Sequence, residues 1–161
     1  MPYTESAARI GLGTELRLGL NDVNPVGSPP ILTETFQLIG EITDISKTGA
    51  KADTVSVYNM QSPDGFDEFI SGKRDAGEVS FTVNLQFGDD SQSLLTNLFT
   101  SGERRNWRIV VPAAPDEEAS PGWYAFKAIV TGYGDSNFTP DKQIAVSAKL
   151  KISGTYVFVP A

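Results

Sequence analysis

Hydrophobic and polar residues alternate along much of this chain with the two-residue period of half-buried β-strands. In Glu78–Phe87 (EVSFTVNLQF) every second residue is apolar and the residues between are polar, and Lys142–Ile152 has the same alternation. Segments rich in β-branched and aromatic residues predict six shorter strands, Glu15–Leu20, Phe36–Ile45, Thr54–Tyr58, Trp107–Val111, Trp123–Gly132 and Thr155–Val159. The pattern therefore predicts a mainly β domain.

One segment, Asp90–Ser101, has helical spacing instead. Its large apolar residues form a narrow helical stripe, Leu94, Leu95, Leu98 and Phe99. Asp89, Asp90 or Ser91 can cap the start of this helix, and Gly102 suits the left-handed position after its end. We expect one helix over residues 90–101, docked on an open end or face of a β-sandwich.

A long segment, residues 46–77, is interrupted only by the predicted strand TVSVY. Loops longer than about 15 residues in compact domains are usually functional or disordered. This one contains Phe66, Phe69 and Ile70, which disordered segments rarely expose to water. We interpret it as an extended arm that needs another surface to cover it.

Composition narrows the chemistry. The 161 residues suit a single domain, and the chain has no cysteine and no histidine, which removes thiolate nucleophiles, Cys/His zinc sites and Ser-His-Asp triads. Asp64, Asp67 and Glu68 lack the alternating ligand spacing of a calcium loop and are interpreted as a solvated turn. We expect no catalytic residue, no metal and no cofactor.

Charge and hydropathy indicate where the protein works. The chain has 13 basic and 20 acidic residues and a net charge of -7, which disfavours tight binding to nucleic acid. Neither a signal peptide nor an apolar run of about 20 residues is found, so we expect a cytoplasmic product that does not bind membranes.

Four blocks of the sequence, in order, resemble the major tail tube protein of long-tailed (siphovirus-like) bacteriophages. The first and longest is Ile39–Leu85, with its Asp-Ile-Ser turn, Ala-Asp-Thr-Val, Ser-Pro-Asp-Gly and Gly-Glu-Val-Ser elements. Arg105–Pro112, Ala125–Gly134 and Asp141–Gly154 continue the match. Together they cover most of the chain.

The resemblance implies a β-sandwich or barrel-like tail tube fold with one helix, spanning residues 1–161 as a single domain. Residues 1–13 would be an N-terminal arm, residues 46–77 an inter-subunit or inter-ring loop, and no C-terminal immunoglobulin-like domain is expected. Six copies would close into a ring, and stacked rings would form the hollow tube through which phage DNA passes. The implied partners are other copies of the chain, a tape measure protein, and tail terminator and tip proteins. The protein would be made in the host cytoplasm and reside in the virion.

The resemblance and the strand pattern together give candidate sites. The polar positions of the two long strands would line the tube: Glu78, Ser80, Thr82, Asn84, Gln86, Gln143 and Ser147. Lys149 and Lys151 do not fit a neutral wall, and we expect them at a barrel rim or paired with carboxylates of a neighbouring copy. The arm would supply the contacts between subunits or rings through Phe66, Phe69, Ile70, Lys73 and Arg74.

Three other functions remain open on the sequence alone. One is a related tail component, such as a tail terminator or a tube of the type VI secretion kind. A second is a monomeric sugar-binding β-sandwich, and a third is a hydrolase that uses a carboxylate pair.

Overall fold

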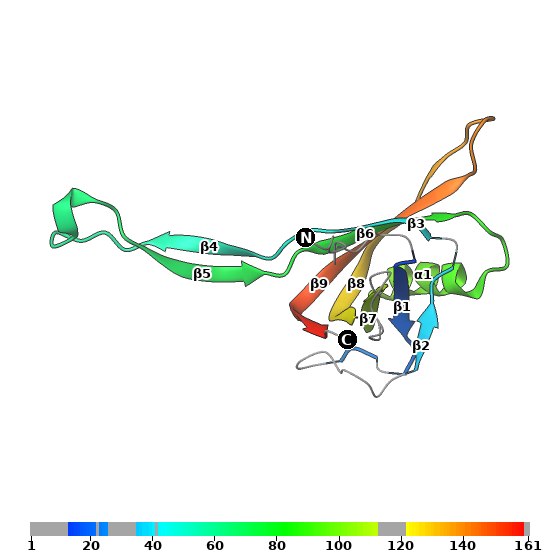
Figure 1. The fold of residues 1–161 in the computed structure, drawn as a ribbon, viewed down its shortest axis with the longest axis horizontal. Coiled ribbons are helices and arrows are strands. Elements are labelled where there is room, and N and C mark those ends of the chain that lie inside the picture. The colour runs from blue at the N-terminus through cyan, green and yellow to red at the C-terminus, as the bar shows by residue number, and fades with distance from the viewer. Residues whose placement is uncertain (1–12, 22, 26–34, 41, 113–121, 160–161) are drawn as a thin grey trace, which may run out of the picture.

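The computed structural model describes residues 13–21, 23–25, 35–40, 42–112 and 122–159. Figure 1 shows a body of strands with one α-helix, from which a long two-stranded arm projects. The elements are β1 (Glu15–Gly19), β2 (Phe36–Leu38), β3 (Ile42–Lys47), β4 (Lys51–Ser56), β5 (Phe69–Asp75), β6 (Glu78–Asn84), α1 (Asp90–Ser101), β7 (Arg104–Val111), β8 (Gly122–Asn137) and β9 (Ala145–Val159). The predicted mainly β fold with one α-helix is confirmed.

Seven strands form one antiparallel sheet in the order β2-β1-β7-β8-β9-β6-β3. The sheet folds over on itself, because the rings of Phe81 in β6 and Trp107 in β7 lie 6.5 Å apart although β9 and β8 separate their strands. In a flat sheet, three strand spacings would hold them about 14 Å apart. The two-layered arrangement expected of a sandwich therefore arises from a single curved sheet, and the core lies inside the curve.

The alternation predicted for the long strands is confirmed within β6 and β9 but fails at their ends, where Phe87 and Ile144 lie outside the strands and are 91% and 37% exposed. In β6 the side chains of Val79, Phe81 and Val83 are buried, while the polar residues between them are partly exposed. The inward face of β9 contributes Val146, Ala148, Leu150 and Ile152 to the same core. Burial of an aliphatic or aromatic side chain of this size stabilises the fold by about 1.5–3 kcal/mol, so this alternation fixes the register of the central strands.

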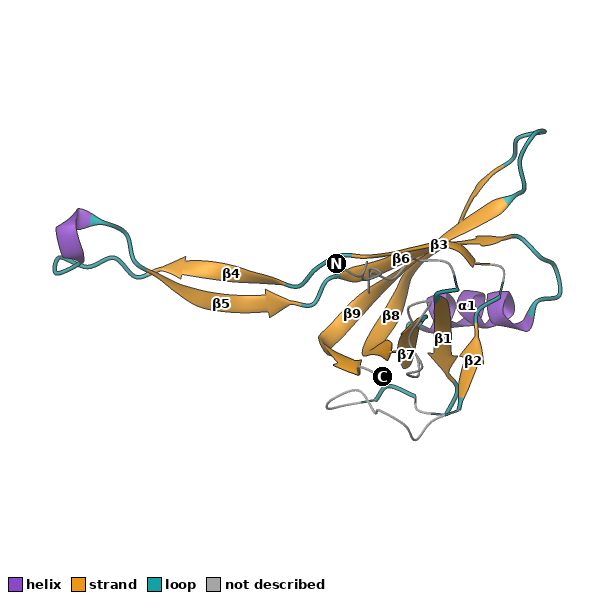
Figure 2. Cartoon of the chain, viewed as in Figure 1, coloured by secondary structure: helices purple, strands orange, loops and turns teal. Residues whose placement is uncertain are grey.

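Helix α1 covers the core beside β8 (Figure 2). It begins after Asp89, whose Oδ1 accepts a hydrogen bond from the Ser91 N–H at 2.9 Å, and ends at Gly102 with φ 71°. Leu95 and Leu98 of the predicted stripe are buried, but Phe99 is 47% exposed. The stripe is thus narrower than predicted, because Ser91 and Gln92 occupy part of the buried face.

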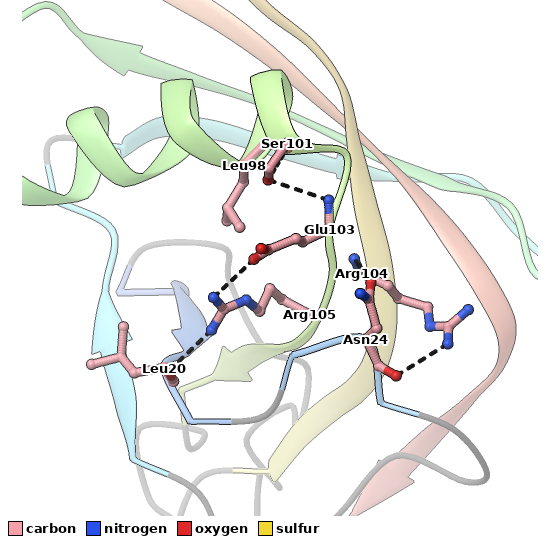
Figure 3. Close-up of polar contacts among 7 residues, drawn as sticks. All are labelled: Leu20, Asn24, Leu98, Ser101, Glu103, Arg104 and Arg105. Carbon is pink, nitrogen blue, oxygen red and sulfur yellow. Dashed lines mark hydrogen bonds and ion pairs between the residues drawn. The ribbon is translucent and has the colours of Figure 1, made fainter.

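The turn from α1 into β7 holds the segment that follows β1 (Figure 3). Arg105 binds Glu103 at 3.0 Å and donates to the carbonyl of Leu20, also at 3.0 Å. The Arg104 N–H donates to Asn24 Oδ1 at 2.9 Å, and the Asn24 N–H donates to the Arg104 carbonyl at 2.8 Å. This network fixes the edge of the sheet that β1 and β2 form.

Several predicted strand boundaries differ from the structure. The predicted Phe36–Ile45 strand is two strands, β2 and β3, because β2 pairs with β1 at one edge of the sheet and β3 pairs with β6 at the other. The predicted Lys142–Ile152 and Thr155–Val159 strands are one strand, β9, which begins only at Ala145. The register of the β8–β9 pairing shifts at several points, and the pairing therefore continues where the alternating pattern is interrupted.

The segment predicted as a loop is an antiparallel hairpin. β4 and β5 pair from Lys51 opposite Asp75 to Ser56 opposite Phe69, with a short 3₁₀ turn at Pro63–Gly65 at the tip. The interpretation of residues 46–77 as an arm thus stands, but the arm is built of strands. Strand β5 (FISGKRD) was missed because both of its faces are exposed, so its sequence does not alternate.

The predicted N-terminal arm, residues 1–13, lies outside the described residues apart from Gly13. Within the described part of the chain, no helix has the length and apolar character needed to cross a membrane.

Candidate functional site

One face of the body carries most of the predicted tube-lining residues. On β6 and β9, Glu78 lies opposite Lys151, Ser80 opposite Lys149 and Thr82 opposite Ser147. Residues directly opposite in an antiparallel pair project from the same face. We call this surface the polar face, and it consists of Glu78, Ser80, Thr82, Asn84, Ser147, Lys149 and Lys151.

Two predicted residues, Gln86 and Gln143, lie beyond the ends of the strands. The Leu85 N–H donates to the Ile144 carbonyl at 2.8 Å, which brings the two segments together. Gln86, Gln143 and Asn84 line a common shallow cleft there. The structure therefore groups these three at one end of the polar face.

Gln92 of α1 organises this end, and the sequence analysis did not single it out. Its side chain is buried, donates from Nε2 to the Asn84 carbonyl at 2.8 Å and accepts from the Gln86 N–H at 3.2 Å. A buried amide needs such partners, and here they fix the turn after β6. The signal available in the sequence was a polar residue on the helix face that also carries Leu95.

The polar face carries charges of both signs. Asp44 of β3 lies opposite Thr82, and Asp135 of β8 lies opposite Ser147, so these carboxylates flank the central strands. Together with Glu78, the polar face and its flanks thus carry three carboxylates and two lysines, Lys149 and Lys151. The tube-lining surface predicted from the sequence carried fewer charges than the observed polar face. Positive charges do not outnumber negative ones among these five residues.

The two lysines that did not fit the predicted wall occupy different positions. Lys149 lies opposite Ser80 and is exposed, in the middle of the polar face. Lys151 binds the two carboxylate oxygens of Asp75, a residue of its own chain, at 2.9 and 2.8 Å. Hydrogen bonds from the Lys151 side chain and the Gly77 N–H lower the pKa of Asp75.

The two strands of the arm are exposed along nearly their whole length. All six residues of β4 are exposed, and in β5 only Gly72 is partly covered. Phe69 and Ile70 are neighbours in β5 and therefore project from opposite faces of the hairpin, with exposed fractions of 60% and 55%. Phe66 lies beside the tip turn and is 73% exposed, while Lys73 and Arg74 lie near the base.

The base of the arm is held firmly to the body. The Glu78 N–H donates to Thr48 Oγ1 at 2.8 Å, and the Thr48 N–H donates to the Glu78 carbonyl at 3.0 Å. Gly77 has φ +96°, and a side-chain Cβ there would lie 2.5 Å from Thr48 Oγ1. Only glycine fits this position, so the direction in which the arm leaves the body is closely specified.

In the described ranges, histidine, cysteine, aspartate and glutamate side chains form no group of three or more that could hold a metal ion.

Solved structures of tube-forming particles share this fold. A chain of the native gene transfer agent virion has a TM-score of 0.66 and 16% identity, over 94% of this chain and 99% of that chain. A chain of the SPP1 tail tube has a TM-score of 0.63 and 12% identity, over 96% of this chain and 80% of that chain. A chain of the sheath-tube complex of an extracellular contractile injection system has a TM-score of 0.67 and 10% identity, over 96% and 93% of the two chains.

The curved sheet, single helix and projecting hairpin are thus a fold found in phage tail tubes. The sequence profile described as lambda phage tail tube protein matches residues 21–158, and the chain belongs to that family. This makes it a structural component of a phage tail tube, as the sequence resemblance implied. No curated protein sequence matches the chain.

Proposed function

We propose that this protein assembles with copies of itself into hexameric rings, and that the rings stack into a hollow tube through which phage DNA is ejected. One observation carries the proposal: a hairpin that extends from the body and exposes large apolar side chains on both faces. An isolated two-stranded hairpin is only marginally stable in water, so another surface is needed to cover it. In a family that builds tubes, the available surface is another copy of the chain.

Ring closure would use the two open edges of the sheet. Among the described strands, β2 and β3 stand at the ends of the order and each pairs on one side only. Unpaired edges invite pairing with another chain, and head-to-tail contacts close into rings. Six-fold symmetry is supported by the similar tail of an empty gene transfer agent particle, which was refined with C6 symmetry.

The polar face would line the tube. Ser80, Thr82 and Ser147 present hydroxyl groups, and nearby carboxylates balance the lysines. Such a wall offers no cluster of cations to phosphate groups, so DNA would pass without being held.

The remaining components follow from the family. A tape measure protein inside the tube, and terminator and tip proteins at its ends, would complete the tail. The protein would be made in the host cytoplasm and become part of the virion, with no cofactor and no enzymatic activity.

Electron microscopy of the purified protein tests the proposal, with a shortened-arm variant for comparison. Thr54 and Ser71 are register partners, so residues 55–70 can be replaced by Asn-Gly, a favoured two-residue hairpin turn. We expect hollow tubes from the natural chain, and folded protein without long tubes from the variant. Solitary monomers of the natural chain at all concentrations would refute self-assembly.

A terminating ring is the second candidate. A chain of the tube-terminating cap of the anti-feeding prophage has a TM-score of 0.70 at 11% identity, so tubes and caps share the fold. The same micrographs separate the two functions, because a cap protein forms single rings that do not elongate.

A further inference from the structure

A cleft of about 790 Å³ lies where the arm joins the body. One wall is the end of β5, from Lys73 to Asp75, with Ala76 after it, and the other is the part of β9 from Lys151 to Tyr156. Figure 1 shows this junction, where β5 runs into β6 beside β9. The half-buried ring of Tyr156 gives the cleft an apolar surface next to its charged groups.

The cleft is positively charged. Lys73, Arg74 and Lys151 line it together with one carboxylate, Asp75. Asp75 binds Lys151, so the excess of positive charge comes from Lys73 and Arg74, both of which are exposed. An occupant with negative charge and an apolar side chain would match this surface.

The tip of the arm has that chemistry. Asp64, Asp67 and Glu68 are all exposed and surround Phe66, whose ring is 73% exposed. The sequence contains no lysine or arginine from residue 52 to residue 72. The arm is therefore divided by charge, acidic at its tip and basic at its base.

We propose that the arm tip of one copy, residues 64–68, docks into the arm-base cleft of another copy. This inference rests on the proposed self-assembly and names the surface that receives the arm. The contact is head-to-tail, with two different surfaces meeting, and repetition of such a contact builds an open series of copies. Paired charges would select the register, and Phe66 would be removed from water against Tyr156.

The tip cannot reach the cleft of its own chain. Lys73 is four residues from Phe69 at the start of β5, or about 13 Å along the extended strand, and the tip lies beyond Phe69. The shallow cleft at the far end of the polar face is a poor receptor for an acidic tip, since Asp89, Asp90 and Asp141 lie close in sequence to the residues that line it.

Disulfide trapping tests the contact, because the chain has no cysteine of its own. One protein carries Asp67→Cys or Glu68→Cys at the tip, and the other carries Lys73→Cys or Arg74→Cys at the cleft. The two are mixed, assembled and oxidised, and non-reducing gels show whether tip–cleft heterodimers form. A disulfide requires Cα atoms about 4.4–6.8 Å apart, so it reports close approach. Lys142→Cys, at the opposite end of the body, replaces the cleft cysteine in the control.

We expect tip–cleft heterodimers at least tenfold more abundant than those with the Lys142→Cys control. Tubes that form normally but give no excess in any of the four tip–cleft mixtures would overturn this inference and leave the proposed function standing. A natural chain that forms no tube under any condition would instead overturn the proposed function.

Charge exchange gives a second, independent readout. Lys73→Glu with Arg74→Glu should abolish elongation, as should Asp64→Lys with Asp67→Lys, because like charges would then face each other. Both sets together restore opposite charges, and we expect tubes to return. Normal tubes from either charge-reversed protein alone would contradict the contact.

Discussion

Lys151 of β9 holds the two carboxylate oxygens of Asp75, at the end of β5, with its ammonium group at 2.9 and 2.8 Å. The pair joins the arm to the body, and its two residues are 76 positions apart in the sequence. An exposed ion pair adds little to overall stability, so we expect this pair to act locally, on the direction of the arm.

Asp75→Asn should therefore loosen the arm without unfolding the body. We expect faster amide hydrogen exchange in β4 and β5, and an almost unchanged thermal unfolding midpoint. Asp67→Asn, which removes a carboxylate near the tip, is the matched control and should leave exchange at the arm base unaltered. Equal exchange in all three proteins would show that the pair does not restrain the arm.

The same pair gives a pH dependence of known sign. The pKa of Asp75 is lowered from its ordinary value of 3.8 in the folded protein, first by the Lys151 hydrogen bond and then by the Gly77 N–H. Its contribution is complete above that ordinary value and is lost as the pH falls through the lowered folded value. The protection factors of the arm amides, which correct for the intrinsic pH dependence of exchange, should thus be equal at neutral pH and at pH 5, and should fall only in stronger acid.

Gly77→Ala should destabilise the chain more than Gly88→Ala. Both glycines have positive φ, +96° and +86°, but a Cβ at residue 77 would lie 2.5 Å from Thr48 Oγ1, whereas nothing lies within 4 Å at residue 88. We expect the left-handed backbone to lower the free energy of unfolding by about 1–2 kcal/mol at either site. At residue 77 the free energy of unfolding should fall further, because Thr48 is displaced. Urea unfolding measures both, and equal losses would contradict the predicted clash.

Gln92→Leu should weaken the connection between α1 and the end of β6. The substitution removes the side-chain amide that binds the Asn84 carbonyl and the Gln86 N–H, and we expect the free energy of unfolding to fall by about 1–3 kcal/mol for the two hydrogen bonds together. Ser93→Ala, on the exposed side of the same turn, should change the free energy of unfolding by less than about 0.5 kcal/mol. A Gln92→Leu protein as stable as the natural chain would show that water satisfies these groups.

Leu95→Ala should cost about 2–5 kcal/mol, since Leu95 is fully buried between helix and sheet. Phe99→Ala removes a larger side chain from the same helix, but that ring is 47% exposed, so we expect a smaller loss. Denaturant unfolding of the unassembled chain gives the comparison. The reverse order would mean that the helix packs by its other face.

Thr82→Lys with Asn84→Lys should impair DNA delivery while tubes still form. The two residues project from the polar face, so twelve added cations around each proposed ring of six would hold phosphate groups. Ser93→Lys with Asn97→Lys adds the same charge to the exposed side of α1 and is the control. Phage complemented with each protein would be assayed for tail length and infectivity, and full infectivity of the first variant would place these residues elsewhere.

Features that depend on local pattern can be predicted from the amino-acid sequence. The alternation from Glu78 to Asn84 allows only one face of this strand to be buried. A shift of one residue would expose Val79, Phe81 and Val83 to water. The spacing of Leu95 and Leu98, between Asp89 and Gly102, similarly specified the helix and both of its ends.

The contacts between distant segments could not be predicted in the same way, because they depend on tertiary packing. β5 has no buried face, so its sequence carries no period, and only its pairing with β4 makes it a strand. The pairing of Lys151 with Asp75 and the reach of Gln92 to Asn84 depend on the curvature of the sheet and on where α1 docks. These are properties of long-range packing, which brings together side chains whose local sequence gives no sign of a partner.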